Sequence, residues 1–253
     1  MPRRKTAPGP TTLFPSNVPR LARLTGGNIV PGTHNSRPVY ATDDAARRWV
    51  WKKEMRADDV LAEALGWLLS RALGVPTPDA ATVGMRGSAS WATELIDAPL
   101  HWGQLRGAVL VNPDAVGAMI GLDVLLGNPD RHASNILCVP QPSADELFAY
   151  SIDLAASWAG DPKGFDAKAL DVPTVDLVIP PEIPVDLIRA GAYAFAQRAQ
   201  DLPVADVRSY VAEACDLVDD PDAALLDKTL QRRITYLGTL LDQYLPLMEA
   251  REP

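Results

Sequence analysis

Several classes of protein are excluded by what this sequence has little of. It contains two cysteines, Cys138 and Cys215, and their wide separation fits neither a disulfide framework nor a metal site. No apolar run is long enough to cross a bilayer, and none follows the basic start, so we expect neither membrane insertion nor a signal peptide. A net charge of -8 argues against a protein that is basic all over and binds nucleic acid directly.

What remains is the composition of an ordinary globular protein. The apolar fraction is 47%, and a chain of 253 residues can bury a substantial core. The length suits one domain of two lobes or two small domains. Because the cysteines lie in apolar surroundings and have no evident partner, we expect a reducing, cytoplasmic location.

Hydrophobic periodicity divides the chain into two parts after a flexible tail at 1–17. Residues 18–96 contain short strand-like segments, including 21–30, and one helix that is expected over 58–73. Residues 97–106 are expected to cross into a second part, 97–253, in which only 154–184 lack a regular pattern. Its predicted helices lie at 115–126, 188–198, 204–217 and 223–248. We therefore expect an α+β fold with a β-rich first lobe and a mainly α-helical second lobe.

One stretch concentrates polar side chains between an apolar helix and a short apolar strand. Residues 127–137 are Gly-Asn-Pro-Asp-Arg-His-Ala-Ser-Asn-Ile-Leu, which places Asp130, His132 and Asn135 close together. A second carboxylate, Asp153, ends the next apolar strand. Phosphoryl transfer needs a carboxylate near the attacking hydroxyl, together with an amide and a carboxylate that hold Mg²⁺ against the phosphates. Asp130 and Asn135 have the spacing of that pair in the protein-kinase catalytic loop.

The order Asp-Arg-His after Gly-Asn resembles the catalytic loop of HipA-like kinases and of phosphatidylinositol 3/4-kinases, not that of ordinary protein kinases. The resemblance covers residues 20–160 and implies a two-lobed protein-kinase-like fold with ATP and Mg²⁺ between the lobes. It implies that Asn135 and Asp153 hold Mg²⁺. It also implies that Asp130 is the base, with His132 as its partner or as the true base.

A kinase also needs a strand lysine that holds the nucleotide phosphates and a helix acid that pairs with it. Lys52 and Lys53 are both candidates for the lysine. We choose Lys52, because the residue two positions before it is Val50, which is small enough to lie over an adenine, whereas Trp51 would crowd the base. By resemblance Glu63 is the paired acid. The plain alternatives are two solvated lysines and an ordinary surface glutamate.

Two further segments are assigned by their position relative to that lysine. A turn-rich loop precedes the lysine strand by one hairpin, as the phosphate loop of a kinase does, although a plain hairpin would explain it equally well. Its candidate contacts are Gly32, Thr33, His34, Asn35 and Ser36. HipA-like kinases autophosphorylate near this loop, so Ser36 is also a candidate modification site. The segment expected to contact the adenine edge as the hinge consists of Glu94, Leu95 and Ile96.

Three charged residues in the second part are interpreted without assigning them any chemistry. Asp123 is the one acid within the apolar helix 115–126, and a buried charge needs a partner. We expect Asp123 to brace the catalytic loop, through Arg131 or through backbone N–H groups. The pair Arg232-Arg233 is interpreted as a solvated helix face.

The sequence thus predicts an ATP- and Mg²⁺-dependent Ser/Thr kinase of the HipA-like type that acts on a protein or on itself. A phosphoinositide or small-molecule kinase ranks lower, because the chain is acidic and has no basic amphipathic helix. A third reading is a catalytically weak pseudokinase that acts as a binding module. The resemblance also implies an antitoxin-like or regulatory protein partner, which nothing in this sequence encodes.

Overall fold

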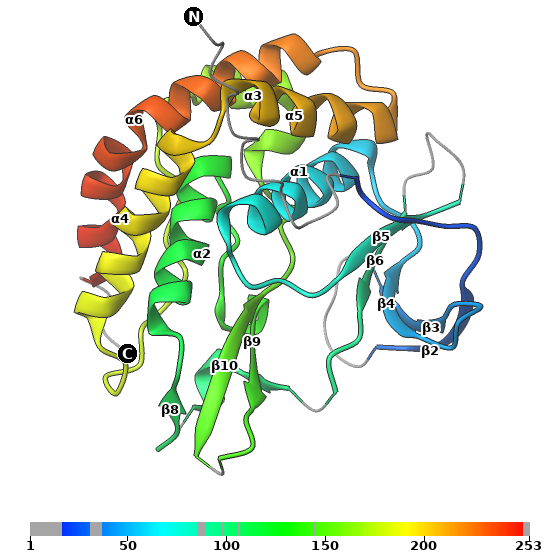
Figure 1. Ribbon diagram of the computed structural model, residues 1–253, viewed down its shortest axis with the longest axis horizontal. Helices are drawn as coiled ribbons and strands as arrows, with labels where there is room; N and C mark the ends of the chain where they lie inside the picture. The colour runs from blue at the N-terminus through cyan, green and yellow to red at the C-terminus, as the bar shows by residue number, and fades with distance from the viewer. Residues whose placement is uncertain are drawn as a thin grey trace, which may run out of the picture.

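The N-terminal part of the chain forms a six-stranded sheet (Figure 1). The computed structural model describes residues 17–30, 37–84, 90–97, 99–105, 107–143 and 145–249. The strands lie in the order β1-β5-β6-β4-β3-β2. They are β1 (Arg20–Leu21), β2 (Thr25–Ile29), β3 (Val39–Thr42), β4 (Arg48–Lys52), β5 (Ala80–Val83) and β6 (Trp91–Glu94). The single strand predicted over 21–30 is wrong, because β1 and β2 lie at opposite edges of the sheet.

Helix α1 (Ala57–Leu73) follows β4 and matches the predicted helix. Asp58 and Asp59 lie in its first turn, where carboxylates stabilise the positive end of the helix dipole. Gly74 ends the helix with a φ of 72°, which glycine adopts without steric penalty. Nearly all side chains after the first turn are buried, because α1 packs against α5 (Val204–Val218) and the turn η3 (Trp158–Gly160) of the C-terminal part.

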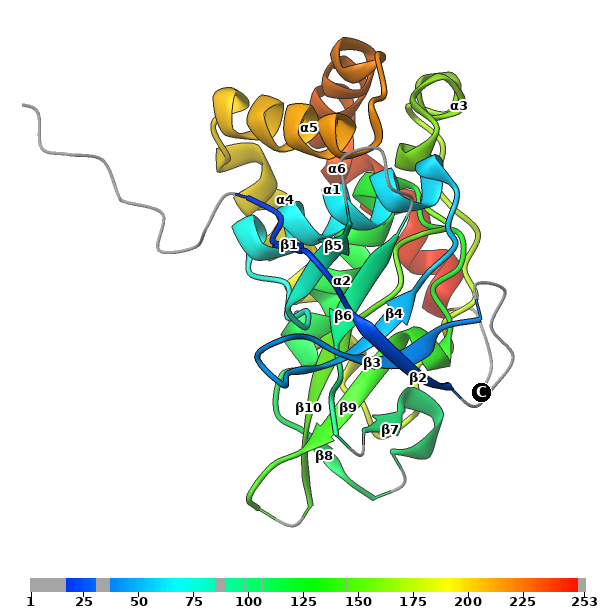
Figure 2. The ribbon, with the colours of Figure 1, turned by 90° about the vertical axis from the view of Figure 1, so that its right-hand side faces the viewer.

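A second sheet of four strands lies below the first, in the order β7-β9-β10-β8 (Figure 2). Its centre is the predicted hairpin of β9 (Ile136–Pro140) and β10 (Glu146–Ser151). Two short strands that the sequence analysis missed, β7 (Leu100–His101) and β8 (Val109–Leu110), extend the hairpin on its two sides. Strands of two residues show no alternation, so the pattern of the sequence could not reveal them.

The C-terminal part is built around helix α2 (Pro113–Leu126), which packs against α4 (Val185–Asp201) and α6 (Ala223–Glu249) (Figure 1). The four long helices of this part agree with the predicted ones to within a few residues. The segment 154–184, for which the sequence predicts no regular structure, contains η3 and a short helix α3 (Pro162–Ala167). The proline at the first position of α3 is a helix-start signal that the prediction overlooked.

The core lies mainly among the helices. One large cluster of buried side chains joins α1, α2, α4, α5, α6 and the second sheet, and it includes Cys138 and Cys215. The first sheet has a small cluster of its own around Trp49. The predicted α+β class is therefore confirmed. None of the helices in the described part of the chain has the combined length and apolarity that a membrane crossing requires.

Candidate active site

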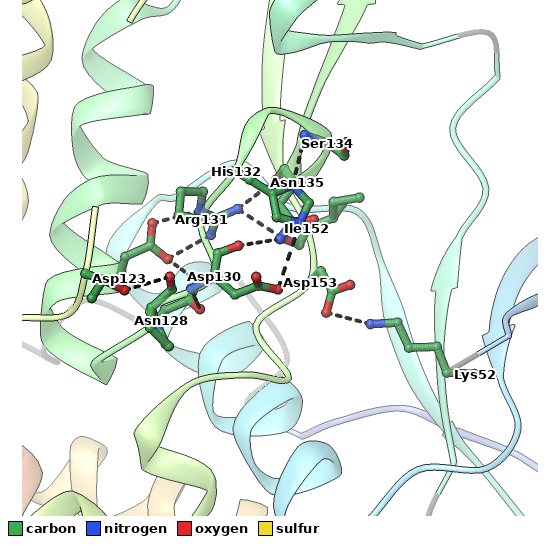
Figure 3. Close-up of polar contacts among 12 residues, drawn as sticks. Lys52, Asp123, Asn128, Asp130, Arg131, His132, Ser134, Asn135, Ile152 and Asp153 are labelled. Carbon is green, nitrogen blue, oxygen red and sulfur yellow. Dashed lines mark hydrogen bonds and ion pairs between the residues drawn. The ribbon is translucent and has the colours of Figure 1, made fainter. Parts of the chain in front are cut away.

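Buried hydrogen bonds to Asp123 fix the loop 127–135 to the end of α2. Arg131 has only 1% of its side chain exposed. Its guanidinium donates to both carboxylate oxygens of Asp123, at 2.7 and 2.9 Å (Figure 3). Asn128 donates to the same carboxylate at 2.8 Å. The prediction that Asp123 braces the loop through Arg131 is therefore confirmed.

Arg131 also ties the loop to the open end of the β9–β10 hairpin. It donates hydrogen bonds to the carbonyl oxygens of Asn135 at 2.7 Å and Ile152 at 3.0 Å, and to the hydroxyl of Ser151 at 2.9 Å. Burial alone would lower the pKa of Arg131, but the adjacent Asp123 carboxylate raises it above its ordinary value. The guanidinium therefore stays charged and forms a fixed joint between helix, loop and hairpin.

The register of the hairpin brings Asn135 and Asp153 to the same place. Ile136 pairs with Ser151, so Asn135 and Ile152 lie opposite each other, and the Ile152 N–H donates to the Asn135 carbonyl at 3.2 Å. Asp153 comes next and has a φ of 59°, a conformation that aspartate tolerates better than most residues.

Lys52 reaches Asp153 from the first sheet (Figure 3). Its ammonium lies 2.7 Å from Oε1 of Glu63 and 2.8 Å from Oδ1 of Asp153. The other oxygen of Glu63 accepts the N–H of Leu154 at 3.2 Å, so this acid bridges Lys52 and the backbone after Asp153. Lys53 instead lies over the ring of Trp51, at 5.0 Å from its centroid. The structure thus brings together the residues predicted to be the phosphate-binding lysine, its paired acid and a metal ligand.

These three charges shift the pKa values of one another. Burial would lower the pKa of Lys52, but Glu63 and Asp153 together outweigh it and raise the pKa. Burial would raise the pKa of Asp153, but Lys52 outweighs it and lowers the pKa. Glu63 is only 6% exposed, and there burial prevails and raises the pKa in spite of Lys52. On acidification Glu63 therefore takes a proton before Asp153 does.

Asp130 and His132 lie on the open side of the loop, with 54% and 43% of their side chains exposed. Nε2 of His132 is 3.9 Å from Oδ2 of Asp130. Nδ1 of His132 accepts the backbone N–H of Ser134 at 3.2 Å. A neutral histidine that accepts a hydrogen bond at Nδ1 carries its proton on Nε2. In that form Nε2 of His132 faces Asp130 with its N–H, at a distance too long for a direct hydrogen bond.

The predicted lysine, helix acid, base candidates and metal ligands all line one cleft, with a volume of about 1580 Å³. Val50 of β4 and Leu137 of β9 line it from the two sheets. The paired glycines Gly26 and Gly27 of β2 line it as well. The sequence analysis missed Leu137 and the glycines. Two signals were present: Leu137 alternates with the buried Ile136, and glycine inside a strand often marks a close approach to a ligand.

The three predicted hinge residues also line this cleft. The N–H groups of Glu94 and Leu95 are used by the carbonyl oxygens of Asp79 at 2.7 Å and Arg48 at 2.9 Å. The N–H of Ile96 forms no hydrogen bond within the described residues. Of the three amides, that of Ile96 is therefore the one available to a ligand.

The predicted phosphate contacts Gly32, Thr33, His34, Asn35 and Ser36 lie outside the described residues. On either side of them, the N–H of Val30 donates to the carbonyl of Pro38 at 2.9 Å. Val30 and Pro38 both line the cleft. The residues that flank the loop thus lie at the cleft, and the phosphate contacts stay predictions.

Asn135 and Asp153 offer the hard oxygen ligands that Mg²⁺ prefers. The side-chain amide of Asn135 donates to the carbonyl of Asp130 at 2.8 Å, which leaves the amide oxygen for another contact. The described residues contain no group of three or more His, Cys, Asp or Glu side chains placed to hold a metal. A Mg²⁺ ion at these two residues would therefore take its remaining ligands from phosphate and water, as it commonly does. The residues present fit such an ion.

The fold has relatives among solved structures. No protein-family model matches this chain, and no curated protein matches it significantly. The proinflammatory kinase CtkA of Helicobacter pylori aligns with 90% of this chain and 99% of its own, at 11% identity and a TM-score of 0.63. This likeness shows that the chain has a protein-kinase-like fold. The finer resemblance to HipA-like kinases stays a prediction.

Two other kinase structures align with much lower TM-scores. The Rio2 kinase–ADP/Mg²⁺–phosphoaspartate complex of Chaetomium thermophilum covers 91% of this chain and 73% of its own, at 14% identity and a TM-score of 0.38. The MAP kinase LmaMPK10 of Leishmania major covers 92% and 85%, at 13% identity and a TM-score of 0.27. These scores are too low to support an argument about the site.

Proposed function

We propose that the protein is an ATP- and Mg²⁺-dependent kinase of the HipA-like type that transfers the γ-phosphate to a Ser or Thr hydroxyl of a protein. The observation that supports this most is the meeting of Lys52, Glu63 and Asp153 in the same cleft as Asp130. In protein kinases the lysine–glutamate pair and the metal-binding aspartate must both be in place before transfer. Here Lys52, Glu63 and Asp153 meet in a single arrangement of the chain, which supports the proposal.

Each residue of this set has a defined role in the proposal. Lys52 holds the α- and β-phosphates, and Glu63 fixes its direction. Asn135 and Asp153 hold Mg²⁺, which when bound neutralises charge on the phosphates. The lowered pKa of Asp153 keeps this carboxylate ionised at neutral pH, as a metal ligand requires.

The adenine would lie between the two sheets. Val50 and Leu137 supply apolar contacts from above and below, and the N–H of Ile96 supplies a donor for the adenine edge. Apolar contacts of this kind hold a flat base and do not require one particular residue type at either position.

Asp130 is the group that orients the acceptor hydroxyl and accepts its proton. It lines the cleft and is the more exposed of the two candidates. His132 has Nδ1 occupied by Ser134 and turns a donor toward Asp130, so it serves as a partner of the carboxylate. This assignment chooses between the two bases that the sequence leaves open.

The acceptor class rests on the sequence resemblance, with support from the size of the cleft. Pockets for small ligands commonly measure about 300–1000 Å³, and the cleft of about 1580 Å³ leaves room beside a nucleotide. A hydroxyl on a protein segment suits that space, and by resemblance Ser36 is the candidate acceptor within the chain.

The test is incubation of the purified protein with Mg²⁺ and γ-labelled ATP, followed by intact mass spectrometry. We expect the parent and Lys53→Met to gain phosphate. We expect Asp153→Asn, Asp130→Asn and Lys52→Met to lose about 10²–10³-fold in rate, the usual effect of removing a group that stabilises the transition state. Lys53→Met is a matched control, because its ammonium lies on the other face of the strand.

Three outcomes would contradict the proposal. Failure of the parent both to bind ATP with Mg²⁺ and to gain or transfer phosphate would leave a kinase-shaped scaffold. Binding without transfer would support a pseudokinase. Transfer to phosphatidylinositol vesicles in place of protein would move the assignment to a lipid kinase.

A further inference from the structure

Helix α6 packs against α2 and α3 (Figure 1). It directs two buried polar side chains toward these helices. They are Thr229 and Arg233, spaced one helical turn apart, and neither has exposed surface. The interpretation of Arg233 as part of a solvated face is therefore wrong, whereas its neighbour Arg232 is exposed. A guanidinium inside an apolar core must be compensated, so its contacts show what it holds.

Arg233 is compensated by backbone carbonyl oxygens. It donates to Leu125 at 2.8 Å and to Val124, both in the last turn of α2. It also donates to Lys168 at 2.9 Å and Asp171 at 3.0 Å, just after α3. Burial lowers the pKa of Arg233 to about 10, although Asp171 opposes the shift. The positive charge thus lies at the negative end of the α2 dipole, where it is stabilised.

Aromatic rings complete this setting. The guanidinium carbon lies 5.3 Å from the ring centroid of Phe165 and 5.9 Å from that of Trp158. Trp158 in turn packs against Gly127, where a Cβ would lie 2.4 Å from the indole ring. One turn earlier on α6, the hydroxyl of Thr229 donates to Asp166 of α3 at 3.0 Å. Helix α6 therefore holds α3 and the end of α2 at a fixed separation.

The last turn of α2 is thus held by two buried arginines. Arg131 binds the Asp123 carboxylate and also donates to the carbonyl of Asn135, a residue proposed to hold the metal. Arg233 binds the carbonyl oxygens of Lys168 and Asp171. The same segment continues to Thr174, whose hydroxyl donates to the carbonyl of Pro129 at 3.3 Å. Pro129 directly precedes Asp130. The path from Arg233 therefore ends at the acceptor side of the catalytic loop.

We infer that Arg233 is a positioning residue for the acceptor side of the site. It holds segment 168–174 against the loop that carries Asp130. This inference rests on the proposed kinase function. It makes the C-terminal helix part of the apparatus for phosphoryl transfer. The segment beside Asp130 is where an acceptor chain would lie, and a shift of about 1 Å there can lower a rate about 10²-fold.

Arginine is suited to this position by its donors. Its planar group carries several N–H donors at fixed angles, whereas lysine offers one compact ammonium. Arg233→Lys should retain the charge and part of the bonding, and Arg233→Met should retain neither. Thr229→Val removes only the bond to Asp166 and nearly preserves the shape of the side chain. Arg232→Met, on the exposed side of the same helix, is the matched control.

The experiment compares these four variants with the parent at a temperature where circular dichroism shows each to be folded. Affinity for a non-hydrolysable ATP analogue with Mg²⁺ is measured by calorimetry. Transfer from labelled ATP is measured with myelin basic protein as acceptor. We expect nucleotide affinity within about two-fold of the parent, and transfer lowered about 10–100-fold in Arg233→Met. Arg233→Lys and Thr229→Val should fall between, and Arg232→Met should match the parent.

Hydrogen exchange gives a readout that does not depend on transfer. The amides of Ala169 and Asp171 donate within the segment, to Asp166 and Lys168, and should exchange faster in Thr229→Val and Arg233→Lys. The inference is overturned if transfer and nucleotide affinity fall together, if transfer is unchanged, or if exchange at 168–174 matches the parent. If Arg233→Met does not fold, Thr229→Val decides. An inactive parent would refute the proposed function, and the inference with it, whereas an active parent with unaffected variants would refute the inference alone.

Discussion

The two walls of the cleft differ in how firmly they are built. The upper wall is the first sheet, whose own core is a small cluster around Trp49 and whose edge strand β2 is exposed along its length. The lower wall belongs to the large helical core. Helix α1 follows β4 in the chain, yet it packs with α5 and η3 of the helical part. Glu63 is therefore anchored in the helical part of the protein, while its partner Lys52 belongs to the sheet with the smaller core.

This difference shows where movement would be expected. Close packing fixes α1 at Gly66, where a Cβ would lie 2.4 Å from Leu154 just after Asp153. Glu63 and Asp153 thus form one unit with the body. The sheet is linked to that unit through the ammonium of Lys52. Opening of the cleft would separate Lys52 from two acids that keep their own positions.

The largest expected effect concerns buried and exposed ion pairs in the two walls. In the lower wall, Arg131→Met would leave Asp123 charged and buried without its partner, which typically costs about 3–5 kcal/mol in the free energy of unfolding. In the upper wall, Arg48 pairs with Asp97, and their side chains are 55% and 70% exposed. Arg48→Met should change stability by less than about 1 kcal/mol. Urea denaturation of both variants checks this, and equal losses would show that the walls do not differ.

A second prediction compares glycines in the two walls. A Cβ at Gly117 would lie 1.9 Å from the carbonyl oxygen of Ile188, so Gly117→Ala should force α2 and α4 apart and destabilise by about 1–3 kcal/mol. A Cβ at Gly26 of β2 would approach the flexible end of Lys53 at 3.0 Å and Val39 at an ordinary contact distance of 3.7 Å, so Gly26→Ala should change stability by about 0.5 kcal/mol at most.

The control for this comparison is Gly238 in α6, where a Cβ would meet no atom of the described residues within 4 Å outside its own helix turn. Gly238→Ala should stabilise the protein by about 0.5–1 kcal/mol, because alanine is the better helix former. Thermal melts of the three variants give the order. A Gly117→Ala protein as stable as the parent would contradict the close packing of α2 and α4.

The smallest expected effect concerns the pH dependence of the link between the walls. The lowered pKa of Asp153 means that its pairing with Lys52 stabilises the fold above the ordinary pKa of 3.8, and that this contribution is lost as pH falls through the lowered value. The raised pKa of Lys52 preserves its contribution until pH rises beyond 10.5. The stability difference between the parent and Asp153→Asn should therefore be present near pH 7 and shrink below about pH 4. Urea midpoints at several pH values measure it, and a difference that disappears near pH 6 would contradict the pairing.

Much of the candidate site could be predicted from the sequence, because it depends on the spacing of residues that are close along the chain. The separation of Asp130 and Asn135 is fixed by one loop, and a hairpin of predictable register carries Asp153 back to that loop. Alternation along β4 distinguishes Lys52 from Lys53, because successive side chains point to opposite faces. Asp123 was predicted to brace the loop because a single acid in an apolar helix requires a partner.

The features that were missed depend on contacts between distant segments. Arg233 looks like a surface residue, since its acceptors are backbone carbonyls more than sixty positions away, and carbonyls leave no trace in side-chain identity. The short strands β7 and β8 form only because the hairpin offers them edges. Leu137 faces the cleft only because β9 buries Ile136 on its other side.

The sequence by itself determined the order of the long helices and of most longer strands, the α+β class and the identity of the polar residues proposed for chemistry. These follow from periodicity and from short spacings, which act within a few residues along the chain. Only the tertiary structure decided that α1 packs with the helical body. It also decided that, of the three predicted hinge residues, Ile96 has the N–H without a hydrogen bond to the described residues, and that Arg233 of α6 binds the end of α2. The physical reason is that burial and the pairing of backbone groups depend on which segments meet, and packing of the whole core decides that.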